Sequence, residues 1–353
     1  MVSPQIVDFI KVSKSAGVSD DDIRAQLLSK GWSQQDIDDS FVVFTNDPAA
    51  INTVSDSAYL ISVSDLINGT VGVWQQHWRQ LFMIVLIAQI PVFISVVLAY
   101  VGLTLGPEKL THNPLSFGPV PFLVGGVVTI VGLAQFWMRA ALIECVTFRD
   151  EGISATDAYG RSFKKLLSYF WVGLLAGFIV GGATLLFVVP GVIVGVWFTF
   201  GTYIVIEGGA KGFTALYRSR RYVEGFWSAV LGRMFLLGLL LGVVGWAYSF
   251  FANGVVALIQ LIPKFGVYIV PVAGVVLDAV SLAIVTASTT IYSRLIYESL
   301  KQVKGDLDME PGTGVKFKYL LISIVGVLLL FLLVGLIIAL ILRMFNELGT
   351  AAY

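Results

Sequence analysis

Residues 166–206 read LLSYFWVGLLAGFIVGGATLLFVVPGVIVGVWFTFGTYIVI, and no basic side chain occurs between Lys165 and Lys211. Because basic clusters favour one side of a membrane, both ends of this stretch belong on that side, and the chain must cross an even number of times between them. Pro190-Gly191 stands where a helical hairpin needs its turn, since proline cannot donate within a helix and glycine relieves the turn. The second arm is short, so a full hairpin and a partly re-entrant one are both open.

Apolar stretches of this kind recur along the chain, and most reach the roughly 20 residues that cross a bilayer as a helix. They lie at 81–105, 120–147, 166–189, 191–206, 234–262, 266–293 and 319–342. Hydrophobic residues make up 57% of the sequence, charged residues 13%, and the mean hydropathy is +0.85, which excludes a soluble domain of this length. The sequence therefore predicts an all-α fold, a polytopic transmembrane bundle of about seven helices.

The basic residues predict the orientation of this bundle. If the N-terminus is cytoplasmic, all but three of the 23 Lys and Arg residues fall on the inside, the exceptions being Lys109, Lys264 and Arg343. We therefore expect a multi-pass protein of the cell membrane with its N-terminus inside and its C-terminus outside. An acidic, helix-patterned segment follows Met1, so we expect no removable signal peptide and an insertion signal in the first crossing.

Residues 1–46 predict a small acidic unit of three helices. Pro4 suits the opening turn of the first helix, and Ser19 and Ser33 are placed to cap the second and third. Trp32 is expected to close a core built from residues at helical spacing, namely Ile6, Phe9, Ile10, Val12, Ile23, Leu27, Leu28, Ile37, Phe41 and Phe44.

With its Gly31-Trp32 turn, this unit resembles ubiquitin-associated-like three-helix modules. The resemblance implies a cytoplasmic protein partner for residues 1–46, and the alternative is a compact cytoplasmic cap. Residues 47–61 lack periodicity and are expected to be a linker. The transmembrane domain is predicted at 62–345, followed by a C-terminal tail at 346–353.

Three segments, 64–80, 154–171 and 211–227, are amphipathic, rich in aromatic residues and followed directly by a crossing. Each is expected to lie in the membrane interface, and together they suggest a threefold helix-plus-hairpin repeat. Contacts with membrane lipids are predicted for Arg161, Lys164, Lys165, Arg218, Arg220 and Arg221. Glycines at small-residue spacing predict close helix contacts at Gly173/Gly177/Gly181, Gly191/Gly195 and Gly238/Gly242.

Several short runs, in one-letter code, occur in order along the second half of the chain. They are FVVPGVI at 187–193, EGG at 207–209, ALYRS at 215–219 and GFWS at 225–228. Together they resemble the membrane domain of glycerophosphoryl diester phosphodiesterases and its stand-alone relatives, well over 155–245 and loosely over 64–300. The resemblance implies a shared multi-helix membrane fold. It does not bring the catalytic barrel of those enzymes, for which this chain has no room.

Ionisable residues inside a predicted crossing are candidate functional residues because burying them in a bilayer is costly. Asp278 is expected near the midplane, with Arg233 on the adjacent helix able to reach toward it. Arg139, Glu144 and Glu207 are expected to cluster near the inner leaflet. Three interpretations are open: a structural network of salt bridges, a polar cavity for a lipid headgroup or small solute, and proton-coupled work at Asp278.

Residue types that known chemistries need are missing. The sequence has no zinc-binding His-Glu-x-x-His, phosphate loop or nucleophile elbow, and its histidines, His77 and His112, have no partner set. We expect no enzymatic activity, cofactor or metal, and no binding of nucleic acid. The single cysteine, Cys145, excludes an intramolecular disulfide.

Two functions are consistent with these patterns. The first is a non-enzymatic scaffold or anchor in which residues 1–46 recruit a cytoplasmic partner. The second is a transporter or lipid-handling protein with a polar site inside the membrane. A tightly packed bundle with paired charges would favour the first, and a cavity reaching the midplane would favour the second.

Overall fold

The structure, a computed structural model, describes residues 6, 9, 10, 13, 14, 19–29, 32–46, 60–105, 119–262 and 266–350. Most of the predicted linker lies outside these residues, as do Lys109, His112 and Lys264. The chain packs as two units, one formed by Met1–Asp65 with Ile296–Asp306 and the other by Leu66–Leu295 with Leu307–Tyr353. Every regular element in the described part is helical, which confirms the predicted all-α class.

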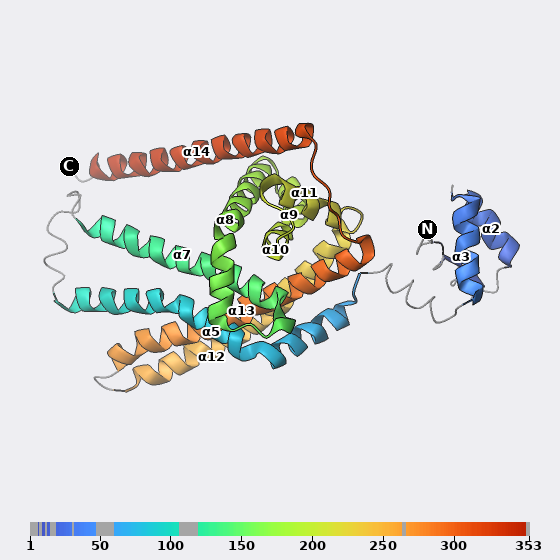
Figure 1. The fold of residues 1–353 in the computed structure, drawn as a ribbon. Coiled ribbons are helices and arrows are strands. Elements are labelled where there is room, and N and C mark those ends of the chain that lie inside the picture. Colours follow the sequence, from blue (N-terminus) through green and yellow to red (C-terminus); the bar gives the residue numbers. More distant parts are fainter. Residues whose placement is uncertain are drawn as a thin grey trace. The chain divides into compact units, whose positions relative to one another are not determined.

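Two of the three helices predicted in the N-terminal residues are α2 (Asp20–Ser29) and α3 (Gln34–Asn46), drawn in blue in Figure 1, whereas Pro4, expected to open the first helix, lies outside the described residues. Both predicted caps are present, because the backbone N–H of Asp22 donates to Ser19 Oγ at 3.3 Å and that of Asp36 to Ser33 Oγ at 3.1 Å. The buried core comprises Ile6, Ile10, Ile23, Leu27, Ile37 and Phe41, with Phe9 and Trp32 packed against it. Leu28 is exposed, and the side chains of Val12 and Phe44 lie outside the described residues.

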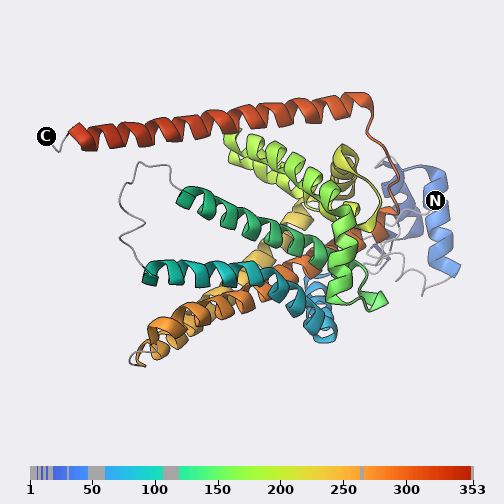
Figure 2. The ribbon, with the colours of Figure 1, turned by 60° about the vertical axis from the view of Figure 1, so that its left-hand side comes forward.

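The first two membrane helices are α5 (Val63–Leu105) and α7 (Pro119–Thr147). The amphipathic segment predicted at 64–80 is not a separate helix, because α5 continues through it into the first crossing and even across Pro91. Figure 2 shows that the first part of α5, in blue, points in a different direction from the rest of the helix. A short 3-10 turn, η1 (Arg149–Glu151), follows α7 and leads to α8.

The hairpin turns earlier than predicted. Helix α8 (Ala155–Leu186) ends at Phe187, whose extended backbone has φ −155° and ψ 139°, and α9 (Val188–Phe198) begins at the next residue. Pro190 therefore lies in the first turn of α9, where its missing N–H removes no helical hydrogen bond. Gly191 packs against the other arm, because a Cβ at this position would lie 2.1 Å from Thr184 Oγ1. The glycine permits the close approach of the arms, while Phe187 makes the turn.

The second arm of the hairpin continues from α9 into α10 (Gly201–Glu207) through a break at Thr199 and Phe200. Ser219 stabilises this break, since its hydroxyl accepts from the backbone N–H of Phe200 at 3.1 Å and donates to the carbonyl of Trp197 at 2.7 Å. Ser219 belongs to α11 (Gly212–Val223), the amphipathic helix predicted within 211–227. Gly225, with φ +88°, then turns the chain into the next membrane helix.

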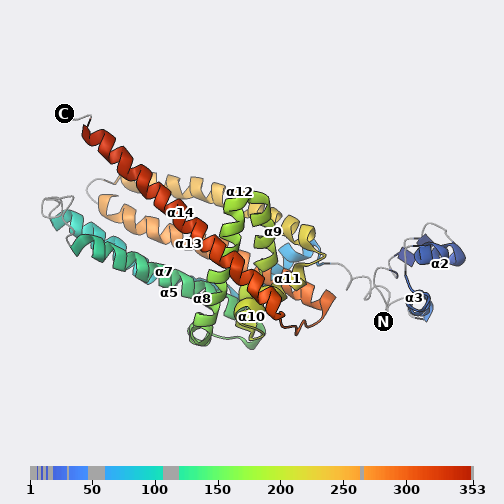
Figure 3. The same ribbon diagram turned by 90° about the horizontal axis from the view of Figure 1, so that it is seen from above.

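Two long helices, α12 (Trp227–Gln260) and α13 (Gly266–Lys304), run antiparallel and side by side in all three ribbon views (Figure 1, Figure 2, Figure 3). Two hydrogen bonds set their register. The hydroxyl of Tyr248 donates to the carbonyl of Leu277 at 2.6 Å, and that of Tyr292 donates to the carbonyl of Arg233 at 3.2 Å.

The last helix, α14 (Thr313–Thr350), packs against α8 and includes the first part of the predicted tail. Within the described residues, seven helical segments are long and apolar enough to cross a membrane: Val63–Leu98, Val124–Thr147, Ala155–Leu186, Val188–Glu207, Trp227–Gln260, Ile269–Lys304 and Thr313–Leu340. The chain is therefore a multi-pass membrane protein. Its main buried cluster joins residues of α5, α7, α8 and α13 and includes Leu81, Met138, Leu142 and Ile291.

Candidate functional site

Glu144 is the most deeply buried carboxylate among the described membrane helices, with 1% of the residue exposed. Lys165 of α8 neutralises it, because its Nζ lies 3.0 Å from Oε1 and 2.9 Å from Oε2. The same ammonium donates to the carbonyl of Ile206 at 2.6 Å. Lys165 thus connects α7, α8 and α10. It balances the charge of the buried Glu144 carboxylate and donates hydrogen bonds to both of its oxygens.

Glu207, at the end of α10, pairs with Arg294 of α13. In the sequence, Arg294 served only to predict the orientation of the chain. Nη2 of Arg294 on α13 lies 3.5 Å from Glu207 Oε1, and 7% of the Arg294 side chain is exposed. This longer pair extends the charged layer from α10 to α13. Glu144 and Glu207 do lie near the same end of the bundle, since Lys165 contacts Glu144 and the residue before Glu207.

Arg233 and Asp278 are not brought together, which corrects the expectation that Arg233 reaches toward Asp278. Arg233 is level with Tyr292 on α13, whereas Asp278 follows Leu277, which is level with Tyr248 on α12. At 1.5 Å per residue the two levels lie about 21 Å apart along the helix pair, a separation that no side chain bridges. Arg233 donates instead to the carbonyl of Ala229 at 3.1 Å, and Asp278 is exposed on the surface of α13.

Arg139 lies beside a cavity of about 260 Å³ between α7, α8, α10 and α13. Its guanidinium has no hydrogen-bond acceptor or ion-pair partner in the described part of the chain. The other polar lining residues are all hydroxyl-bearing: Tyr169, Thr202, Tyr203, Thr286, Thr289 and Thr290. An arginine at the centre of a membrane helix costs roughly 3 kcal/mol on insertion scales, and this cost falls when the side chain reaches water, an anion or the membrane interface.

Of the six basic residues predicted to contact lipids, five contact other residues of the protein, four through ion pairs and one through an aromatic ring. Besides Lys165, Arg161 pairs with Glu151 at 2.6 Å and Arg221 with Glu224 at 2.8 Å. The hydrogen bond to Glu224 raises the pKa of the Arg221 guanidinium above its ordinary value.

Arg218 is the fourth engaged residue. It donates to the carbonyls of Gly209 at 2.8 Å and Met309 at 3.2 Å and pairs with Asp308, so it holds the segment between α13 and α14. Arg220 lies over the Trp197 ring, 4.4 Å from its centroid. Lys164 is exposed and has no partner among the described residues. It remains the clearest candidate for a lipid contact.

The close contact between α8 and α14 uses glycines other than those predicted for α8. A Cβ on Gly182 would lie 2.6 Å from Gly326 Cα, and a Cβ on Gly326 would lie 2.2 Å from the carbonyl oxygen of Phe178. A Cβ at Gly173, Gly177 or Gly181 would meet no atom of the described chain within 4 Å. The prediction of close contacts at these three glycines is therefore wrong, and the glycine of α8 that packs against α14, Gly182, is the residue after Gly181.

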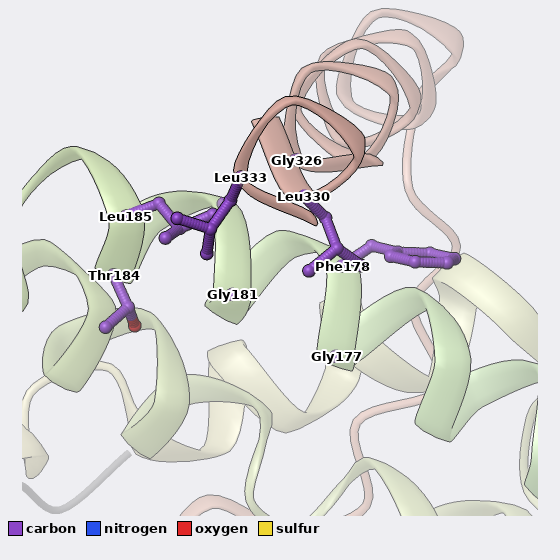
Figure 4. Close-up of a pocket in the computed structure, with 9 residues that line it drawn as sticks. Gly177, Phe178, Gly181, Thr184, Leu185, Gly326, Leu330 and Leu333 are labelled. Atoms are coloured by element: carbon purple, nitrogen blue, oxygen red, sulfur yellow. The ribbon is translucent and has the colours of Figure 1, made fainter. Parts of the chain in front are cut away.

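Beside this contact, α8 and α14 enclose an apolar hollow of about 350 Å³. Gly177 and Gly181 line it, and the side chains of Leu185, Leu330 and Leu333 lie between the two helices (Figure 4). The glycines predicted at Gly238/Gly242 likewise have no described neighbour within 4 Å of a Cβ, whereas Gly191 does make a close contact.

Residues that could hold a metal ion are dispersed in the described part of the chain. Among these residues, no group of three or more His, Cys, Asp or Glu side chains comes together. Cys145 is buried in α7, with 3% exposed.

The sequence did not predict the pairing of Lys165 with Glu144, the role of Arg294 or the hydroxyl lining of the cavity. A usable signal exists for the lining, since Thr286, Thr289 and Thr290 recur at helical spacing on one face of α13. Comparison of the chain with models of protein families, with curated proteins and with solved structures finds no match in any of the three.

Proposed function

We propose that this protein is a non-enzymatic membrane scaffold, in which the helical bundle acts as the anchor and residues 1–46 recruit a soluble partner. One observation carries the proposal: the carboxylates Glu144 and Glu207, packed among the membrane helices, are held in ion pairs between helices. Lys165 compensates Glu144, and Arg294 compensates Glu207. Ion pairs of this kind fix the positions of the helices relative to one another. Neither carboxylate is then free to serve in a transport path through the membrane.

A transport path through Arg233 and Asp278 has no support in this geometry, because the two residues lie at different levels and Asp278 is exposed. The cavity beside Arg139 extends along α13 from Thr290 only as far as Val285. That limit lies about 10 Å short of Asp278 along the helix.

The recruiting role rests on the N-terminal unit. Its six buried apolar residues form a core of their own, and the acids in the first turn of α2 are exposed. We place this unit in the cytoplasm because the basic residues of the sequence are sorted to its side of the membrane. We also propose that residues 155–245 share the membrane fold of glycerophosphoryl diester phosphodiesterase relatives, on the strength of the sequence runs between Phe187 and Ser228.

Cross-linking in membranes, read out by mass spectrometry, tests the proposal on the full chain. Ile23→Asp places a charge in the core of the N-terminal unit, whereas Gln26→Asp places the same side chain at an exposed position of α2. We expect a defined set of soluble proteins to cross-link to the unaltered chain and to Gln26→Asp but not to Ile23→Asp. If the cross-linked set is the same in all three, the N-terminal unit recruits nothing and the scaffold proposal is wrong.

A further inference from the structure

Arg139 differs from other arginines of the membrane helices, because no residue in the described part of the chain binds it. Arg233 donates to a carbonyl of its own helix, Arg161 pairs with Glu151, and Arg294 pairs with Glu207. The Arg139 side chain instead borders the cavity of about 260 Å³. Its planar guanidinium offers several N–H donors to whatever occupies that space.

Two further donors are uncommitted at the same cavity. The hydroxyls of Tyr169 on α8 and Thr202 on α10 make no hydrogen bond within the described residues, although the Tyr169 residue is only 7% exposed. The threonines of α13 donate to carbonyls of their own helix, Thr289 at 2.7 Å and Thr290 at 2.7 Å, so their oxygens keep lone pairs. The cavity is thus rich in donors that the described protein atoms do not use.

The cavity lining carries one positive charge and no acidic residue among the described side chains. The nearby acids Glu144 and Glu207 are each occupied by another cation. A ligand for this space should therefore be an anion that can accept several hydrogen bonds at once. A phosphate group meets both requirements, and its oxygens match the fork of an arginine.

The depth of Arg139 is compatible with a lipid source for that phosphate. Helix α7 ends at Thr147, followed by the charged turn Arg149–Glu151. Arg139 lies about 12 Å from this end at 1.5 Å per residue. Arginine side chains extend toward the interface, and the headgroup layer of each leaflet is about 6 Å thick, so a headgroup phosphate and the guanidinium can meet.

We propose that the cavity lined by Arg139, Tyr169 and Thr202 is a binding site for a phosphate group, provided either by the headgroup of an anionic phospholipid or by a free phosphate ion. Arg139 supplies the charge and the paired donors, and the two hydroxyls supply the remaining hydrogen bonds. The site lies at the end of the bundle where α7 finishes.

Native mass spectrometry of the full chain tests the proposal. The protein is reconstituted with phosphatidylcholine alone or with added phosphatidylglycerol, extracted in mild detergent, and measured with and without inorganic phosphate. Three variants are compared: Arg139→Gln, Tyr169→Phe and the control Lys318→Gln. The control removes one exposed positive charge of α14 that does not line the cavity. Thermal unfolding of each variant shows whether it remains folded, and Arg139→Lys retains the charge should Arg139→Gln fail to fold.

We expect phosphatidylglycerol retention to fall about tenfold to a hundredfold in Arg139→Gln, less in Tyr169→Phe, and not in Lys318→Gln. If inorganic phosphate binds with the same dependence on Arg139 while no lipid is retained, the site takes the free ion. The proposal is overturned if neither phosphate source depends on Arg139. It is also overturned if Lys318→Gln weakens binding as much as Arg139→Gln, because surface charge would then explain the retention.

Discussion

Lys165→Met is the substitution whose effect the structure defines best. It removes the ammonium group that holds both oxygens of Glu144, at 3.0 and 2.9 Å, and the carbonyl of Ile206 at 2.6 Å, while keeping an unbranched apolar side chain. Glu144 remains in place with 1% of its surface exposed, so its charge is left without a partner.

The size of the effect follows from this burial. Removing one partner of a buried ion pair costs about 3–5 kcal/mol of stability. The Lys165 side chain is 29% exposed, so water already offsets part of the interaction, and we expect a loss of about 3 kcal/mol. Replacing both partners by apolar residues, in Glu144→Leu/Lys165→Met, should restore most of it because no buried charge is left.

Unfolding in mixed detergent and sodium dodecyl sulfate micelles, followed by tryptophan fluorescence, measures these free energies. Glu151→Gln is the matched control, since it breaks the exposed pair with Arg161, whose side chains are 49% and 45% exposed. Such surface pairs contribute about 0–1 kcal/mol. Equal losses in Lys165→Met and Glu151→Gln would refute the reasoning, as would a double variant no more stable than Lys165→Met alone.

Other contacts of the chain lead to three more predictions. Gly326→Ala should lower the free energy of unfolding by about 1–3 kcal/mol in the same assay, because its Cβ would overlap a backbone carbonyl, whereas Gly177→Ala should change it by less than about 0.5 kcal/mol; similar losses in both would contradict the contact. Ser154→Ala should cost about 1 kcal/mol by removing the capping box of α8, as thermal unfolding would show, and an unchanged midpoint would mean that the cap is not formed. Cys145 should resist a membrane-impermeant maleimide in folded protein, so a cysteine introduced by Ser3→Cys should label alone and only from the cytoplasmic side; labelling from outside in sealed cells would reverse the proposed orientation.

The helical content and the number of membrane segments could be predicted from the sequence because both depend on local composition. An apolar run of about 20 residues cannot satisfy its backbone in a bilayer except as a helix, wherever its neighbours lie. The caps at Ser19 and Ser33 were predictable for the same reason, since a cap needs only a hydroxyl and a backbone N–H a few residues away.

The position of the hairpin turn and the contacts between helices were harder to predict from the sequence. Pro190-Gly191 is the strongest local turn signal, yet the chain turns at Phe187, because proline fits the first turn of α9 and glycine permits the close approach to Thr184. Gly177 and Gly181 have the spacing of a packing face, but Gly182 faces α14. Spacing along one helix says which residues share a face, and not which face its neighbour covers.

Hydropathy is a property of the chain alone, and it determined that this protein is a helical bundle in a membrane. The tertiary structure decided which charges meet. The register of α12 against α13 places Arg233 and Asp278 at different levels. The packing of α7, α8 and α10 joins Lys165 to Glu144 and leaves Arg139 beside a cavity lined by hydroxyl groups. Helix rotation and register fix these pairings, because a shift of a few residues along a helix carries a side chain to another face and another depth.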